Sequence, residues 1–139
     1  MRSKVVICGS YHRDPAELAK IFRELEATGC RVLSPISLGF ADPKSLFVRT
    51  ATEYGTPMAD IEAYHLRTIR DADFVWLHVP KGYVGMSAAF EIGYAAAWRK
   101  PIFCRELPED EMLRTQVLLV GSVFEALEHL QPAIDNCHE

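Results

Sequence analysis

The chain has 139 residues, and 49% of them are hydrophobic, which fits one compact domain spanning residues 1–139 with its own core. Its 15 basic and 19 acidic residues give a formal charge of −4, which argues against binding nucleic-acid polymers through a basic surface. No apolar run is long enough for a signal peptide or a membrane span, so we expect a soluble, cytoplasmic protein that does not bind membranes.

The first part of the chain predicts a strand, a helix and a second strand. An apolar run at residues 4–8 ends at Gly9. Asp14 and Pro15 are typical of a helix start, and Gly29 is typical of the residue that follows a helix. The apolar residues between them recur at helical spacing. We therefore expect a strand at 4–8, a helix at 14–28 and a strand at 31–34.

An irregular segment follows at residues 35–57, where glycine and proline alternate with aromatic residues. A connection of this length in a compact domain is more often a functional loop than a linker. Phe40, Phe47 and Tyr54 could stack on a nucleobase or pack within the loop.

The second part of the chain predicts a helix at 58–70 and a buried strand at 74–79. A turn with glycines at both ends, Gly82 to Gly85, leads into a helix at 87–98 with Glu91 in its first turn. Strands at 101–104 and 117–120 and a helix at 122–130 complete the chain. Strands that alternate with helices predict an α/β fold with a parallel sheet and helices on both faces. We expect a five-stranded, doubly wound sheet of the Rossmann or flavodoxin type, with strand order 2-1-3-4-5.

In such a sheet, ligands bind at the carboxyl ends of the strands where the strand order reverses. Here that point lies between the first and third strands, and the loops at 9–13 and 80–87 lead away from it. Both loops are rich in small residues and precede a helix, so they could hold an anionic or hydroxyl-rich ligand. Neither a complete GxGxxG pattern nor a GK[ST] motif is present, so dinucleotide and Walker-type sites are not indicated.

The four cysteines lie far apart and form no CxxC pair, so the spacing indicates neither a zinc cage nor a disulfide scaffold. We expect reduced thiols. These residues are Cys8, Cys30, Cys104 and Cys137.

Several segments resemble the nucleoside 2-deoxyribosyltransferase superfamily, which includes the deoxynucleoside 5′-monophosphate N-glycosidases. They are Cys-Gly-Ser-Tyr at 8–11, Asp-Ala-Asp at 71–73 and, most specifically, Ala-Phe-Glu-Ile-Gly-Tyr-Ala at 89–95. The order and approximate length of the whole chain also agree with this superfamily. The resemblance implies cleavage or transfer at an N-glycosidic bond, without a metal or redox cofactor.

The resemblance also implies roles for individual residues. Glu91 matches the nucleophile that forms a covalent glycosyl intermediate; otherwise it is a carboxylate that stabilises its own helix. Asp73 matches an acidic residue that orients or protonates the leaving base, or it caps the turn before its strand. Gly9, Ser10 and Tyr11 match positions that contact the sugar or its phosphate, or they form a tight turn.

Two positions bear on the substrate. Gly85 stands where the transferases carry an acidic partner for a sugar hydroxyl, and Ser87 could bond a hydroxyl or a phosphate. The resemblance to the monophosphate N-glycosidases, which carry small uncharged residues and serine in this loop, favours a nucleotide and hydrolysis over transfer. Arg13 could bind a 5′-phosphate, or it is a solvated loop residue.

We therefore expect a retaining, metal-independent N-glycosidase that acts on a nucleoside or a nucleoside 5′-monophosphate. The superfamily commonly completes its sites across a subunit interface, which implies a homodimer or a larger homo-oligomer. The alternative is a non-catalytic nucleotide-sensing module of the same architecture. The phosphoribohydrolases rank lower, because their PGGxGT segment is missing. The base, the sugar and the acceptor stay open at this point.

Overall fold

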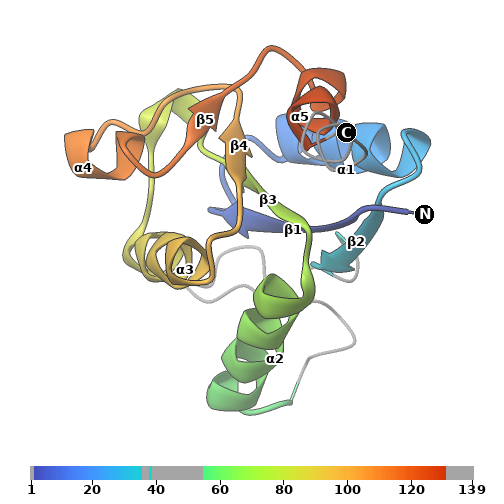
Figure 1. Cartoon of the computed structure of the whole chain (residues 1–139). Helices are drawn as coiled ribbons and strands as arrows, with labels where there is room; N and C mark the ends of the chain where they lie inside the picture. The colour runs from blue at the N-terminus through green and yellow to red at the C-terminus, as the bar shows by residue number, and fades with distance from the viewer. Residues whose placement is uncertain (1, 36–37, 39–54, 131–139) are drawn as a thin grey trace.

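The computed structural model describes residues 2–35, 38 and 55–130. They form one five-stranded, all-parallel sheet with strand order β2-β1-β3-β4-β5, as predicted (Figure 1). Phe40, Phe47 and Tyr54 lie outside the described residues, and so does Cys137.

Each predicted strand and helix is present, with ends that differ by at most two residues from the expected ones. Two short elements were not predicted, the 3-10 turn η2 and helix α4, because three or four residues show no periodicity. The elements in chain order are β1 Lys4–Gly9, α1 Pro15–Ala27, β2 Arg31–Ser34, α2 Met58–Asp71, β3 Phe74–His78, η2 Pro80–Gly82, α3 Met86–Ala97, β4 Ile102–Cys104, α4 Glu111–Arg114, β5 Leu118–Leu119 and α5 Val123–Leu130.

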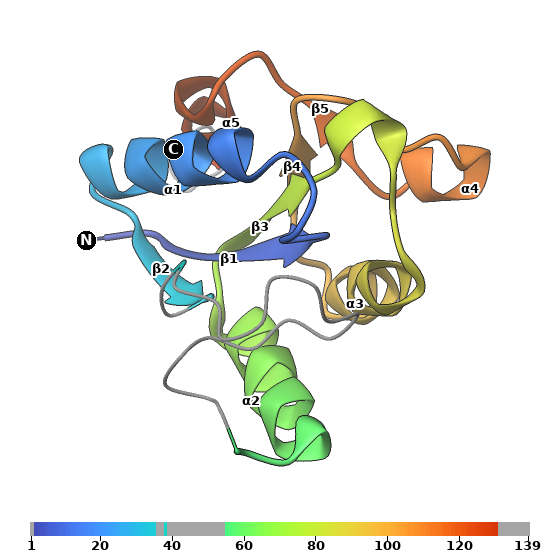
Figure 2. The same cartoon turned by 180° about the vertical axis from the view of Figure 1, so that it is seen from behind.

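The sheet separates two layers of helices. Helices α1 and α5 cover one face, while α2 and α3 cover the other, as the views from the front and from behind both show (Figures 1 and 2). Residues of β1 alternate between the two faces, so that Val5 and Ile7 pack toward α1, and Val6 and Cys8 pack toward α2 and α3. Every residue of β3 is buried, as expected for a central strand of a parallel sheet.

The carboxyl ends of β1 and β3 lie side by side, because Cys8 pairs with Leu77 and Gly9 pairs with His78. Only glycine fits at position 9: its φ is +134°, and a Cβ atom there would lie 2.0 Å from the carbonyl oxygen of His78. The close approach of these strand ends fixes the start of the two loops that were predicted to form the site.

Local signals at the start of α1 act as predicted. The Asp14 side chain accepts a hydrogen bond from the backbone N–H of Glu17, and Pro15 occupies the first turn. The start of α3 differs from the expectation. This helix begins at Met86, so Glu91 is its sixth residue and lies in the second turn, not in the first.

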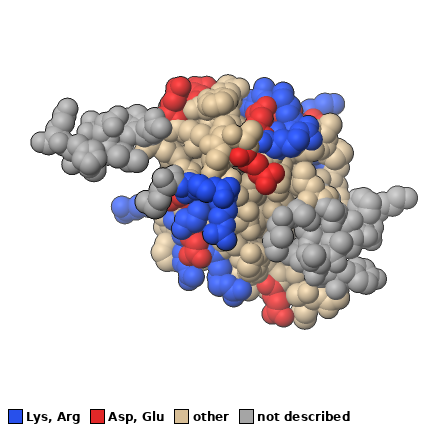
Figure 3. All heavy atoms as spheres, turned by 90° about the vertical axis from the view of Figure 1, so that its right-hand side faces the viewer, with Lys and Arg blue, Asp and Glu red and all other residues tan. Residues whose placement is uncertain are grey.

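None of the described helices is long and apolar enough to cross a membrane. Among the described residues, Cys8, Cys30 and Cys104 are buried free thiols. On the face drawn in Figure 3, basic and acidic side chains both occur, with uncharged surface between them.

Candidate active site

Glu91 lies on the buried side of α3 and points toward the carboxyl end of β1 and toward α2. Only 8% of the residue is exposed, and its Oε1 lies 3.4 Å from Nε2 of His65 on α2. Because Glu91 lies in the second turn of α3 and not in the first, the groups that act on its carboxylate differ from those expected. Since the helix dipole acts mainly on the first turn, the side chains of α2, and not the start of α3, dominate the surroundings of this carboxylate.

His65 connects Glu91 to two strands. Its Nδ1 lies 2.6 Å from the hydroxyl of Ser34, at the end of β2, and its Nε2 lies 3.7 Å from the thiol of Cys8 on β1. The imidazole is buried and has polar partners on both of its nitrogens. These contacts fix the orientation of the ring and hold Nε2 against the carboxylate of Glu91.

Glu62 is a second carboxyl group at the same place. It lies one turn before His65 on α2, so both side chains leave the same side of that helix. Its Oε1 is buried and has no hydrogen-bond donor among the described residues. Burial, the negative charge of Glu91 and a hydrogen bond with that carboxylate raise the pKa of Glu62 to about 7, against the lowering effect of His65. Part of the Glu62 population therefore keeps its proton at neutral pH.

Cys8 completes the cluster. Burial, followed by the negative charges of Glu91 and Glu62, raises the pKa of the Cys8 thiol well above its ordinary value. The sulfur is therefore a neutral thiol and a poor nucleophile.

The two loops at the switch point do meet. The guanidinium of Arg13 lies 3.6 Å from the ring centroid of Tyr83, and Nε2 of His78 lies 2.6 Å from the backbone oxygen of Arg13. Arg13 is exposed, and its contact with Tyr83 brings it near the start of α3, because Tyr83 also lies beside Gly85.

Gly85 and Ser87 occupy the start of α3. Gly85 is the residue that precedes the helix, and a Cβ atom on it would lie 3.4 Å from the Tyr83 hydroxyl. Ser87 is exposed and lies four residues before Glu91, on the same side of the helix. Ser87 therefore lies one turn before Glu91 along α3, and Gly85 precedes that turn.

Residues of the first loop, at 9–13, lie in two different places. Gly9 and Ser10 lie at the carboxyl end of β1, next to Cys8. The hydroxyl of Tyr11 donates to the backbone oxygen of Ile7, and its ring packs on the core cluster under α1 and α5. Tyr11 therefore lies toward the opposite face of the sheet from Glu91.

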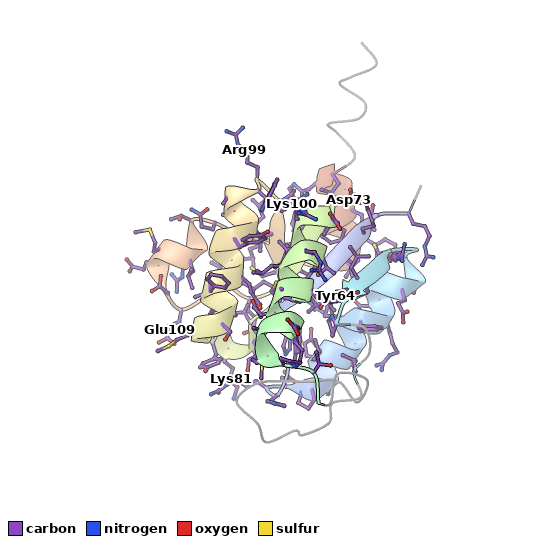
Figure 4. The ribbon with its side chains drawn as sticks, turned by 90° about the horizontal axis from the view of Figure 1, so that it is seen from below. Tyr64, Asp73, Lys81, Arg99, Lys100 and Glu109 are labelled. Atoms are coloured by element: carbon purple, nitrogen blue, oxygen red, sulfur yellow. The ribbon has the colours of Figure 1, made fainter. Side chains whose placement is uncertain are left out.

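Asp73 lies at the amino end of β3, where its carboxylate accepts a hydrogen bond of 2.7 Å from the backbone N–H of Lys4. Cys8, beside Glu91, pairs with Leu77, four residues further along β3, or about 13 Å at the usual rise of a strand. Figure 4 shows Asp73 toward one end of the molecule and Lys81, in the loop after β3, toward the other. The structure does not bring Asp73 to Glu91.

A small hollow lies on the α1 side of the same edge, lined in part by Glu17, His78 and Arg105. Its volume of about 30 Å³ is near that of one water molecule, so a nucleotide does not fit there.

The sequence analysis missed Glu62, His65, Ser34 and Cys8 as members of this cluster. One signal was present: Glu62 and His65 are polar residues three positions apart on the side of α2 that carries its buried residues. Helical periodicity alone does not tell which carboxylate such residues meet.

Comparison with known proteins gives a match of structure only. No protein-family model matches the chain, and no curated protein matches its sequence. Among solved structures, the chain is similar to the CMP N-glycosidase BcmB of Clostridium botulinum. The match covers 92% of this chain and 98% of that one, with 16% sequence identity and a TM-score of 0.53. This similarity confirms the fold that the sequence resemblance implies.

Proposed function

We propose that this protein is an N-glycosidase that cleaves a nucleoside 5′-monophosphate into a free base and a sugar phosphate. The observation that carries the proposal is the position of Glu91, a buried carboxylate held against His65 and Glu62 at the ligand-binding edge of the sheet. The shared fold with a CMP N-glycosidase and the Phe-Glu-Ile-Gly-Tyr segment around Glu91 support the same chemistry.

The reaction proceeds in two steps. A carboxylate oxygen of Glu91 bonds to the anomeric carbon while the bond from that carbon to the base nitrogen breaks, and its electron pair leaves with the base. Water then attacks the anomeric carbon and releases Glu91 as a carboxylate. Two displacements retain the anomeric configuration, and neither step needs a metal ion or a redox cofactor.

Glu62 is the acid that we assign to the departing base. It is a carboxyl group with a pKa raised to about 7, within hydrogen-bonding reach of Glu91, and its buried oxygen has no donor among the described residues. In the first step its proton passes to the base nitrogen, and in the second step the resulting carboxylate accepts a proton from water. His65 acts as a positioning residue, because its bond to Ser34 orients Nε2 toward Glu91.

Residues of the two loops supply the contacts for the sugar and the phosphate. Arg13 provides the positive charge that a 5′-phosphate requires, and the Ser87 hydroxyl provides a hydrogen bond. An uncharged Gly85, in place of a carboxylate, removes repulsion of a phosphate and favours a nucleotide over a nucleoside. Gly9 and Ser10 face the same edge from β1.

The proposal also includes the oligomeric state and the cellular location of the protein. We propose a cytoplasmic homodimer in which the outer side of α3 is the contact, because this side carries exposed apolar residues. They are Met86, Phe90 and, just after the helix, Trp98.

The test is a panel of ribo- and deoxyribonucleosides and their 5′-monophosphates, incubated with the protein and followed for free base by chromatography. Base release from a monophosphate, faster than from the matching nucleoside, supports the proposal. Binding of a nucleotide without release across the whole panel would instead support the sensing module. Addition of a second free base separates hydrolysis from transfer, since only transfer yields a new nucleotide.

A further inference from the structure

Three potential metal ligands meet beside the proposed nucleophile. The Sγ of Cys8, Nε2 of His65 and a carboxylate oxygen of Glu91 all lie within 4.8 Å of one another. All three residues are buried, and they come from three different elements, β1, α2 and α3. This arrangement differs from an exposed cluster of acidic residues, because it combines a thiol, an imidazole and one carboxylate around a common point.

Two of the three separations are close to those of a tetrahedral zinc site, and the third, between Cys8 Sγ and the Glu91 carboxylate, is within 4.8 Å. Bonds of about 2.3 Å to sulfur and about 2.0 Å to nitrogen or oxygen put tetrahedral ligand atoms about 3.3 to 3.6 Å apart. In the structure, Cys8 Sγ lies 3.7 Å from His65 Nε2, which lies 3.4 Å from Glu91 Oε1. A cation placed between these atoms would need only small side-chain shifts.

The surroundings of the imidazole also suit a metal ligand. Ser34 lies 2.6 Å from Nδ1 of His65, so Nδ1–H can donate to its hydroxyl while the lone pair of Nε2 points at the cluster. Ligating histidines almost always have such a hydrogen bond on the other nitrogen, which fixes the tautomer and the ring orientation. A water molecule can supply a fourth ligand.

We propose that Cys8, His65 and Glu91 form a binding site for Zn²⁺. The thiolate and the imidazole select a borderline-soft transition metal, and not Mg²⁺ or Ca²⁺, which prefer oxygen ligands. On binding, the thiol of Cys8 loses its proton to solvent, and a proton on Nε2 of His65, where present, leaves as well. No electron is transferred. The spacing of the cysteines in the sequence gives no sign of this site, because its ligands come from distant segments.

Zinc at this site would block catalysis. The metal would bond to the carboxylate that must attack the sugar, so zinc binding and turnover would exclude each other. This consequence rests on the proposed function, whereas the binding site itself does not.

The experiment is a titration of the tag-free, chelator-treated protein with Co²⁺, a spectroscopic substitute for Zn²⁺. Cys137 and His138 are neighbours in the sequence and could capture metal on their own, so every protein in the series carries C137S and H138N. We expect a thiolate-to-cobalt charge-transfer band together with the visible bands of tetrahedral Co²⁺, and loss of both when one equivalent of Zn²⁺ is added.

The variants identify the ligands. Cys8→Ser should lose the charge-transfer band, while the matched control Cys104→Ser, another buried strand cysteine, should keep it. Ser34→Ala should keep the band but weaken cobalt binding about 10-fold, because it removes only the partner of Nδ1. Circular dichroism confirms that each variant is folded.

The result that overturns the proposal is a parent protein with no charge-transfer band at millimolar Co²⁺, or a band that persists unchanged in folded Cys8→Ser. If Cys8→Ser does not fold, an unchanged cobalt affinity in folded Ser34→Ala would count against the site. These spectra do not depend on catalysis. A protein that binds cobalt but releases no base would refute the proposed function alone, and one that releases base but binds no cobalt would refute the metal site alone.

Discussion

At the scale of single residues, the proposed chemistry depends on two neighbouring carboxyl groups, Glu62 and Glu91. Burial, followed by the charge of Glu91 and a hydrogen bond with it, raises the pKa of Glu62 to about 7. Oε1 of Glu91 lies 3.4 Å from Nε2 of His65, in a position that suits the proposed nucleophile. The raised pKa of Glu62 suits the proposed acid.

The first prediction concerns the pH dependence of catalysis in chelator-treated protein. An acid must be protonated, and the pKa of Glu62 is raised to about 7, so kcat/KM should fall above pH 7. Glu91, His65 and Cys8 are the titratable groups that face Glu62. Glu62→Gln should lower kcat/KM by about 100-fold or more below pH 7 and remove this decline.

The matched control is Asp60→Asn, which removes an exposed carboxylate from the same helix and should leave the profile unchanged. A decline above pH 7 that persists in Glu62→Gln would assign the titration to another group.

Stability should depend on pH through the same carboxyl group. The unfolded chain releases the Glu62 proton near pH 4.5, whereas the folded protein keeps it to about pH 7. The folded state therefore binds more protons in this window, and the free energy of unfolding should fall as pH rises through it. Urea titrations should show that Glu62→Gln gains stability relative to the parent as pH rises from 4.5 to 7. A difference between the two that stays constant over this range would contradict the shift.

At the scale of elements, the sheet sets which ends of the strands can take part in chemistry. Glu91, His65 and Cys8 meet near the carboxyl ends of β1 and β2, while Asp73 lies at the amino end of β3. There its carboxylate joins β3 to the backbone of β1 through Lys4. Asp73 therefore makes a structural contact between two neighbouring strands.

Because Asp73 lies at the amino end of β3, a variant can distinguish a structural role for this residue from an acid-base role in catalysis. Asp73→Asn should destabilise the fold by about 1 kcal/mol, because it weakens a hydrogen bond to a charged group, and should change kcat by less than about threefold. Thermal unfolding and base release measured on the same preparation decide between the roles. A loss of about 100-fold in kcat, with stability unchanged, would restore the acid-base role implied by the sequence resemblance.

The elements themselves were largely predictable from the sequence. Apolar runs, the Asp14-Pro15 start of α1 and the glycine after it are local signals, and local signals define strands and helices. The position of Glu91 was less certain, because helix ends are harder to predict than helices, and α3 begins one residue earlier than expected. The contact of Glu62 with Glu91 is long-range, and no local pattern predicts it.

At the scale of the whole molecule, the outer side of α3 is one of the apolar surfaces that the described residues leave exposed. Met86 is 94% exposed and Phe90 is 57% exposed, and a Cβ atom on Gly93 would meet nothing within 4 Å. These residues are spaced by four and three positions, so they follow one side of the helix. A second copy of the chain could approach closely along this side.

The homodimer can be tested by light scattering after size-exclusion chromatography. We expect the mass of a dimer for the parent and the mass of a monomer for Phe90→Glu, because a buried charge without a partner would break the contact. Phe124→Glu is the matched control, since Phe124 is exposed to a similar degree but lies on α5. A monomeric parent, or a dimer that both variants keep, would place the contact elsewhere or exclude it.

The most direct test of the central claim is the rate of base release by Glu91→Gln, measured on a nucleoside 5′-monophosphate cleaved by the parent. The amide preserves the shape of the side chain but cannot form the glycosyl ester, so we predict that kcat/KM falls by about 1,000-fold or more. Nucleotide affinity, measured by calorimetry, should change less than tenfold, and the exposed control Glu109→Gln should match the parent. Base release by Glu91→Gln within tenfold of the parent rate would contradict the account.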